Sequence, residues 1–249
     1  MRPERKSQPH AKSLARRSGA RLVVLGKEPL DSDIVWLTVP DDAIAEVART
    51  LAKAQSWKNT IVLHSSGALT SDELAPLRKE GARVASVHPM MTFVRGTAPE
   101  MAGVSFAVEG DTAALRAARS IVEDLGANSF VIQKRNKALY HAFGSFASPL
   151  VIALLASMEQ VAVAAGIRKQ DIKPVMVPLL WQTLRNYLKK DSAAAFSGPL
   201  MRGDVATIRK HLAELRKLPE VREVYLALCK ASLELLPVKN RAAVKRGLR

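Results

Sequence analysis

Short β-rich runs alternate with helical patterns over residues 20–133, and this alternation limits the possible folds more than any other feature of the chain. Such an order is typical of a parallel sheet whose strands are joined by crossover helices. The pattern predicts strands at 20–25, 34–39, 60–64, 83–88, 104–109 and 129–133, and helices at about 41–55, 70–80 and 111–125. We therefore expect an α/β fold in this part of the chain.

The composition changes after Gln133, where β-branched runs give way to long helical periods. Helices are expected at about 136–165, with a break near Pro149, and then at 170–190, 204–217 and 219–236, because proline interrupts a helix interior. Gly166 is a candidate C-terminal stop for the first of these helices. The sequence thus predicts two domains, an α/β domain over 1–133 and an all-α domain over 134–249.

Charge and composition exclude several classes of protein. The formal net charge of +15 would favour polyanions or a phosphorylated ligand, but the basic residues are spread along the chain and lack aromatic interleaving, so nucleic-acid binding is not expected. The single cysteine, Cys229, lies in a helical apolar pattern and is expected to pack in a core in a reducing cytoplasm. No run approaches about 18 unbroken apolar residues, so we expect no membrane span. The first residues also lack the apolar core of a signal peptide.

Three polar segments follow predicted strands, at "TVPDD", "HSSG" and "HPMMTF". In open parallel sheets, ligands bind beyond the carboxyl ends of the strands. Ser65, Ser66 and Gly67 would leave short side chains and backbone N–H groups free to meet a ligand there. The alternative is that they form a tight turn and that Thr70 caps the next helix.

A polar stripe opens the helix after the boundary. Lys137, His141 and Ser145 are spaced at i, i+4 and i+8 and share one face, with Ser148 close to it. This face is expected to point into a cleft between the domains, although a solvated face would look the same.

A metal centre and a serine hydrolase are poorly supported by the sequence. His64, His88 and His141 could converge, but no HxxH or HExxH spacing is present, so we predict no metal site. A serine hydrolase would need a GxSxG elbow, which the chain lacks.

Four stretches together resemble a known family. "DIVWLTVPDDAIAEVARTLA", "VLHSSGALTSDELAPLRKEGARVASVHPMMTF", "KALYHAFGSFAS" and "SGPLMRGDVATIRKHLAEL" look like the Rossmann-like proteins that carry the domain of unknown function 2520. The resemblance covers roughly residues 8 to 236. It implies a dinucleotide-binding domain followed by a helical domain like those of 6-phosphogluconate dehydrogenase and pyrroline-5-carboxylate reductase. It also implies an NADP-linked oxidoreductase that acts as a homodimer on a small carbonyl or hydroxy compound.

The resemblance assigns roles to individual residues. In the related β-hydroxyacid dehydrogenases, a lysine and an asparagine four residues later handle the substrate's proton and hydroxyl, and the matching positions here are Lys137 and His141. We therefore expect Lys137 to transfer the proton and His141 to orient the substrate oxygen. The nicotinamide side of the cofactor site is expected at Val39, Pro40, His64, Ser65, Ser66 and Gly67. Substrate contacts are expected at His88, Tyr140, Ser145, Ser148, Arg202 and Asp204, and the last two could instead serve the dimer contact.

Three departures from the family pattern stand out. An asparagine is replaced by His141, and Pro149 stands where a polar residue is expected. The largest departure is that no two glycines are separated by one residue, so the G-x-G-x-x-G loop that brings a pyrophosphate to a helix N-terminus is missing.

Aligned by its later motifs, Met1 falls near the end of the second expected strand. The basic cluster that would hold a 2′-phosphate is then Arg2, Arg5, Lys6 and Ser7. We expect either a chain shortened before its first βα unit or a divergent paralogue without dinucleotide binding. Two functions follow, an NADP-dependent reductase or dehydrogenase and a non-catalytic dimeric protein.

Overall fold

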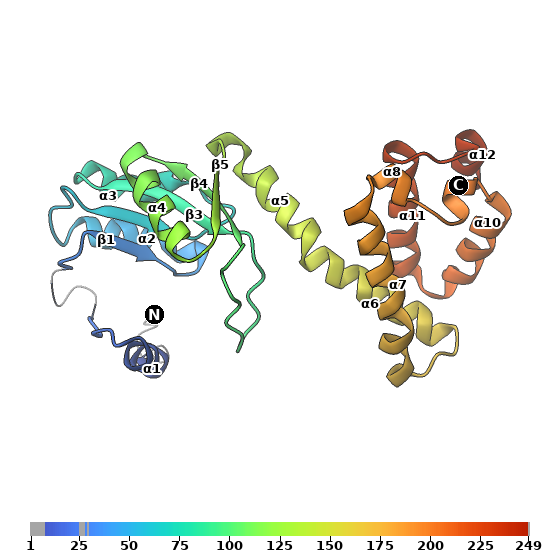
Figure 1. The fold of residues 1–249 in the computed structure, drawn as a ribbon, viewed down its shortest axis with the longest axis horizontal. Helices are drawn as coiled ribbons and strands as arrows, with labels where there is room; N and C mark the ends of the chain where they lie inside the picture. The colour runs from blue at the N-terminus through green and yellow to red at the C-terminus, as the bar shows by residue number, and fades with distance from the viewer. Residues whose placement is uncertain (1–7, 25–27, 29, 249) are drawn as a thin grey trace. The chain divides into compact units, whose positions relative to one another are not determined.

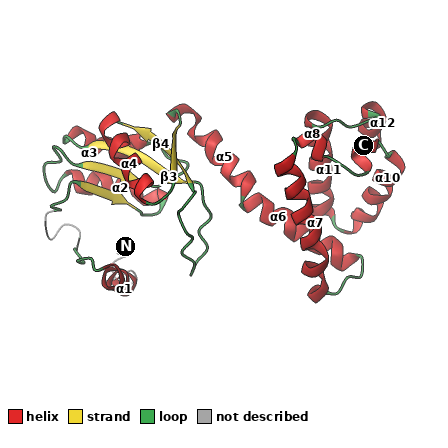
Figure 2. Cartoon of the chain, in the orientation of Figure 1, coloured by secondary structure: helices red, strands yellow, loops and turns green. Residues whose placement is uncertain are grey.

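The computed structural model describes residues 8–24, 28 and 30–248. The chain forms two compact units, Met1–Ser145 and Phe146–Arg249. All strands of the described residues belong to the first unit, and residues 146–248 contain helices and no strand (Figure 2). This arrangement confirms the predicted α/β part followed by an all-α part.

The first unit is built on a five-stranded sheet with the order β1-β2-β3-β4-β5 (Figure 1). Its strands are β1 (Ile34–Leu37), β2 (Ile61–His64), β3 (Arg83–Pro89), β4 (Ser105–Gly110) and β5 (Asn128–Val131). The pairs β1–β2, β2–β3 and β4–β5 are parallel, and β3–β4 is antiparallel.

The structure corrects two expectations about this sheet. The strand predicted at 20–25 is absent over the described residues 20–24, where Leu22 is 41% and Val24 46% exposed; residue 25 lies outside the described part. An extended apolar run becomes a strand only when a neighbour satisfies its backbone groups. The antiparallel pairing of β4 follows from its connection, because residues 90–104 form no helix and a parallel return needs a crossover segment.

Alternate residues of the strands point to opposite faces of the sheet, and helices cover both. Val62 packs with α2 (Asp41–Ala52) and α3 (Ala75–Lys79) in one apolar cluster, whereas its neighbour Leu63 belongs to a second cluster with α4 (Thr112–Asp124). The unit also contains helix α1 (Gln8–Ser18), which the sequence did not predict, and two short 3₁₀ helices, η1 (Ser71–Leu74) and η2 (Lys134–Asn136). With helices on both faces, the ends of the strands are the position at which open sheets bind ligands.

Helix α5 (Lys137–Ala147) leads out of the sheet and ends where proline was predicted to break it, since α6 (Pro149–Ala164) begins two residues later. The helices that follow are α7 (Lys169–Lys189), α8 (Ser192–Ala195), α9 (Pro199–Arg202), α10 (Val205–Glu214), α11 (Pro219–Leu235) and α12 (Arg241–Gly247), with a 3₁₀ turn η3 (Leu215–Lys217). Ile208, Leu212, Leu233 and Val244 form the core of this unit together with the buried thiol of Cys229, as expected for a packing cysteine.

One helical stretch, Lys134–Ala164, is long and apolar enough to cross a membrane by length and composition. A single stretch of this kind is weak evidence for a membrane. Its most apolar part is not buried within the chain. A helix that packs against a second protein chain has the same composition.

Candidate functional site

A row of polar side chains crosses three strands at one end of the sheet. His64 of β2 pairs in register with Ser86 of β3, which pairs with Glu109 of β4. All three are buried, with relative exposures of 0%, 0% and 3%. Buried polar groups need hydrogen-bond partners, so each of these three side chains must be paired with a group from a neighbouring segment.

Lys137, the first residue of α5, supplies the charge that balances Glu109. Its Nζ donates to Ser86 Oγ and lies 3.4 Å from Glu109 Oε1. The Glu109 carboxylate also accepts two hydrogen bonds from Ser71, one from the backbone N–H at 2.7 Å and one from the hydroxyl at 2.8 Å. Burial lowers the pKa of Lys137, and the Glu109 charge opposes that shift. The Lys137 residue is only 1% exposed, so its amino group is held inside the contact between α5 and the sheet.

His64 folds the "HSSG" turn that follows β2. Its Nδ1 accepts from the Ser66 N–H at 3.1 Å, which leaves the ring proton on Nε2 to donate to the Thr70 carbonyl at 3.0 Å. Burial and the nearby Lys137 charge lower the pKa of His64 to about 4, so the ring is neutral at pH 7. Both ring nitrogens of His64 therefore have hydrogen-bond partners within the turn.

Ser66 and Ser65 hold the rest of this turn, which we call the lip (residues 65–67). Ser66 Oγ donates to Asp41 Oδ2 at 2.7 Å and accepts from the Leu69 N–H at 2.9 Å. Ser65 Oγ accepts from Trp36 Nε1 at 2.8 Å. The turn-and-cap alternative is thus partly correct, since Thr70 also accepts from the Asp72 N–H. These bonds give the lip one fixed shape beside the N-terminus of α2.

Val39 and Pro40 lie where β1 passes into α2. Val39 is half-buried and Pro40 is exposed directly before the first residue of the helix. Their backbone and the lip therefore belong to the carboxyl ends of two adjacent parallel strands, the position at which open sheets bind ligands.

Helix α5 brings Tyr140 and His141 to the lip, beside His88 of β3. His88 Nδ1 lies 2.7 Å from the Tyr140 hydroxyl, and the two rings meet edge to face. His141 lies beside His88, with ring centroids 6.3 Å apart. A Cβ at Gly67 would fall 2.6 Å from His88 Nε2 and 2.7 Å from His141 Cδ2, so only glycine fits beneath these rings. The structure thus joins Gly67, His88, Tyr140 and His141 in one cluster.

The face of α5 that meets the sheet differs from the predicted stripe. Lys137, Tyr140, His141 and Gly144 face it at i, i+3, i+4 and i+7, with Gly144 against the sulfur of Met90. Ser145 lies outside this row and donates its hydroxyl to the carbonyl of His141.

Three predicted site residues belong to the second unit. Ser148 is the half-buried residue before α6, and Arg202 is exposed at the end of α9. Asp204 caps α10, where its carboxylate accepts from the backbone N–H and the hydroxyl of Thr207, and these bonds lower its pKa. Arg2, Arg5, Lys6 and Ser7 lie outside the described residues. Among the residues that are described, no group of three His, Cys, Asp or Glu side chains could hold a metal ion.

Sequence reasoning missed Glu109, Ser86 and Asp41. Glu109 carried a signal, because it places a carboxylate at the end of the mainly apolar strand predicted at 104–109, and a buried charge needs a partner. Ser86 and Asp41 carried none, since each becomes part of the site only through register and turn geometry.

Comparison with known proteins places these features in a family. A model described as a domain of unknown function (DUF2520) matches residues 104–232, more than half of the chain, and a Rossmann-like domain model matches residues 10–89. The chain belongs to the DUF2520 family. No curated protein matches it.

Solved structures share the whole fold of this DUF2520 protein. Protein TM1727 from Thermotoga maritima is 24% identical with a TM-score of 0.70, covering 97% of this chain and 89% of the other. BF3122 from Bacteroides fragilis, provisionally described as an NADP oxidoreductase, is 18% identical with a TM-score of 0.73, covering 90% and 84%. An imine reductase from Myxococcus stipitatus, solved with NADP+, is 16% identical with a TM-score of 0.64, covering 100% and 90%. At these identities the similarity establishes the fold.

Proposed function

We propose that this DUF2520 protein is an NADP-dependent oxidoreductase that transfers a hydride between the nicotinamide and a small carbonyl, imine or hydroxy compound. The observation that carries the proposal is the cluster of Gly67, His88, Tyr140 and His141 beside a rigid lip at the carboxyl ends of parallel strands. The solved structures of similar fold include an imine reductase with NADP+. The natural substrate is left open as a class.

The described residues fit the nicotinamide half of NADP. Val39, Pro40 and the lip would hold the ring through backbone groups and the Ser65 hydroxyl. When bound, the cofactor supplies the hydride. Arg2, Arg5, Lys6 and Ser7 are proposed for the 2′-phosphate, and His141 for orienting the substrate oxygen.

Lys137 has a different role in this proposal from the one its family position implied. Its ammonium group is paired with Ser86 and Glu109. Ser86 Oγ in turn donates a hydrogen bond to the carbonyl of Ser66 at 3.2 Å. The lysine therefore ties α5 to the lip. In this proposal it positions the site and does not exchange a proton with the substrate.

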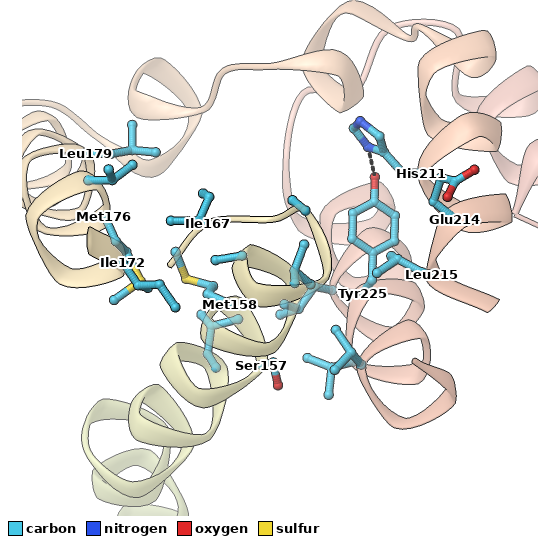
Figure 3. A pocket seen from close by; sticks show the side chains of 18 residues that line it. Ser157, Met158, Ile167, Ile172, Met176, Leu179, His211, Glu214, Leu215 and Tyr225 are labelled. Atoms are coloured by element: carbon cyan, nitrogen blue, oxygen red, sulfur yellow. Dashed lines mark hydrogen bonds between the residues drawn. The ribbon is translucent and has the colours of Figure 1, made fainter. Parts of the chain in front are cut away.

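A second copy of the chain is proposed as the partner of the helical unit. An apolar groove of about 580 Å³ opens there, lined by side chains that include Met158, Met176, Leu179 and Leu228 from α6, α7 and α11 (Figure 3). Leu179 and Trp181 are 66% and 58% exposed. Exposed apolar surface of this extent favours protein association, and a cytoplasmic homodimer would cover it. Arg202 is proposed for that contact or for an anionic substrate.

The alternative function is a dimeric protein without catalysis. It is favoured by one observation, the absence of a G-x-G-x-x-G loop from this sequence. Isothermal titration with NADPH, NADP+ and NADH separates the two proposals. Saturable binding of NADPH with a Kd below about 100 μM, equivalent to roughly −5.5 kcal/mol, supports the reductase. Flat heats with all three nucleotides refute it and support the alternative.

A further inference from the structure

Two tyrosine–histidine pairs of nearly the same geometry occur in the described chain. Tyr140 and His88 meet at 2.7 Å with an interplanar angle of 87°, and Tyr225 and His211 meet at 3.0 Å with an angle of 84°. Both contacts use the Nδ1 atom of the histidine. The second pair lies in the apolar groove of the helical unit (Figure 3), so the chain carries its own control for the first.

The direction of the Tyr140–His88 hydrogen bond follows from acidity. A phenol is a stronger acid than a neutral imidazole N–H, and an imidazole nitrogen is a stronger acceptor than a phenol oxygen. Tyr140 is also nearly buried, where an unpaired O–H donor would be costly. The arrangement of lower energy is therefore Tyr140 O–H donating to His88 Nδ1, which leaves the imidazole proton on Nε2.

We infer that Tyr140 fixes this tautomer so that His88 presents its Nε2–H above Gly67 as the proton donor to the substrate atom that is reduced. The inference rests on the proposed reductase function and names the group that function requires. Burial is the main reason that the pKa of His88 is lowered to about 4, so at pH 7 the ring is neutral and carries a single proton. The position of that one proton is therefore decided by Tyr140.

Gly67 allows the imidazole of His88 to lie directly against the lip. A Cβ there would come within 2.6 Å of Nε2, although the backbone of Gly67 is not in the left-handed region that requires glycine. The need for glycine is therefore one of space beside His88. His141, which is exposed, forms the other side of this space.

The proton transfer balances within the pair. As the carbonyl oxygen or imine nitrogen gains negative charge from reduction by the nicotinamide, it takes the proton of Nε2. Nδ1 takes the proton of Tyr140, and the phenolate recovers a proton from water. Burial raises the pKa of Tyr140 to about 12, but an alkoxide or amide anion is a stronger base than this phenolate, so the transfer is downhill.

The tautomer can be measured without turnover. In ¹⁵N-edited NMR spectra at pH 7, we expect His88 to be protonated at Nε2 and not at Nδ1 in the 249-residue chain. Tyr140→Phe should mix the two tautomers of His88 and leave His211 unchanged, and Tyr225→Phe should do the reverse. A proton on Nδ1 of His88, or an His88 spectrum unaffected by Tyr140→Phe, would overturn the inference.

The proton-donor role is tested with NADPH and two probes, the cyclic imine 1-pyrroline and the ketone cyclohexanone. Tyr140→Phe should lower kcat for a reduced probe by about 10²-fold or more, the scale of general acid catalysis, with NADPH affinity unchanged. Full turnover in Tyr140→Phe, or a wild type that binds NADPH and reduces neither probe, contradicts the inference. Absence of NADPH binding by the wild type is the separate failure of the proposed function, and the NMR result then still decides the tautomer.

Discussion

Removing the Lys137 ammonium should reveal how strongly the buried pair holds α5 to the sheet. Lys137→Met leaves the Glu109 carboxylate 3% exposed, with only the two bonds from Ser71 to compensate its charge. Breaking one partner of a buried ion pair costs about 3–5 kcal/mol, so the folding equilibrium constant of this unit should fall by roughly 10²- to 10³-fold or more.

The double variant Lys137→Met/Glu109→Gln separates the charge effect from packing. A glutamine amide can still accept from the Ser71 N–H and donate to its hydroxyl, so both charges are lost while these bonds remain. Replacing a buried pair by neutral groups is often close to neutral in energy. We therefore expect the double variant to lie within about 2 kcal/mol of the wild type.

Urea denaturation followed by Trp57 fluorescence is the appropriate assay, because Trp57 is fully buried in the core of the first unit. Lys134→Met is the matched control, since Lys134 makes an exposed ion pair with Asp72 and should cost no more than about 1 kcal/mol. Two results would show that the ion pair does not hold α5 to the sheet in this way. One is a loss of unfolding free energy below about 1 kcal/mol for Lys137→Met, and the other is a double variant as unstable as the single one.

Three further changes test other parts of the structure. Because the pKa of His64 is lowered from 6.5 to about 4 in the folded chain, the unfolded chain binds more protons between these pH values. The free energy of unfolding should therefore fall by about 3 kcal/mol as the pH drops through this window. In His64→Asn, the urea midpoint should depend less on pH. Gly67→Ala should displace His88 and weaken NADPH binding in calorimetry at unchanged far-UV circular dichroism; unaltered affinity would argue against the lip as the nicotinamide site. Leu179→Asp places a charge in the apolar groove and should yield monomers in light scattering, whereas Arg185→Asp on the same helix should not; a dimeric Leu179→Asp protein would contradict the proposed interface.

Strands and helices could be predicted from the sequence where a local feature, such as an apolar run or a proline, determines them. The run "TIVLH" became β2, and the proline at 149 ended α5 because a proline lacks the N–H that a helix interior needs. The run at 20–25 has the same composition as a strand, but its pairing depends on a neighbour that composition does not describe. β4 likewise has the residues of a parallel strand, and only the helix-free connection at 90–104 reveals its direction.

Some contacts of the candidate site follow from the sequence, and others do not. The lip, His88, Tyr140 and His141 come together because the carboxyl ends of strands and the first turns of the following helix share one edge of the sheet. The role of Lys137 could not be read from its spacing on α5, since its burial depends on Glu109, which is separated from it by 28 residues and joined only through sheet register. Contacts set by register are invisible to helical periodicity.

Energy transfer from Trp36 to NADPH is the most direct test of whether the nicotinamide binds at the lip. Trp36 donates a hydrogen bond to Ser65 of the lip, so a nicotinamide bound there would lie within a few ångströms of the indole. We expect a saturable loss of tryptophan emission with matching emission from the reduced nicotinamide, and Trp36→Phe should lower this signal more than Trp181→Phe does. No transfer at NADPH concentrations up to about 1 mM, equivalent to roughly −4.1 kcal/mol, would contradict a nicotinamide site at the lip.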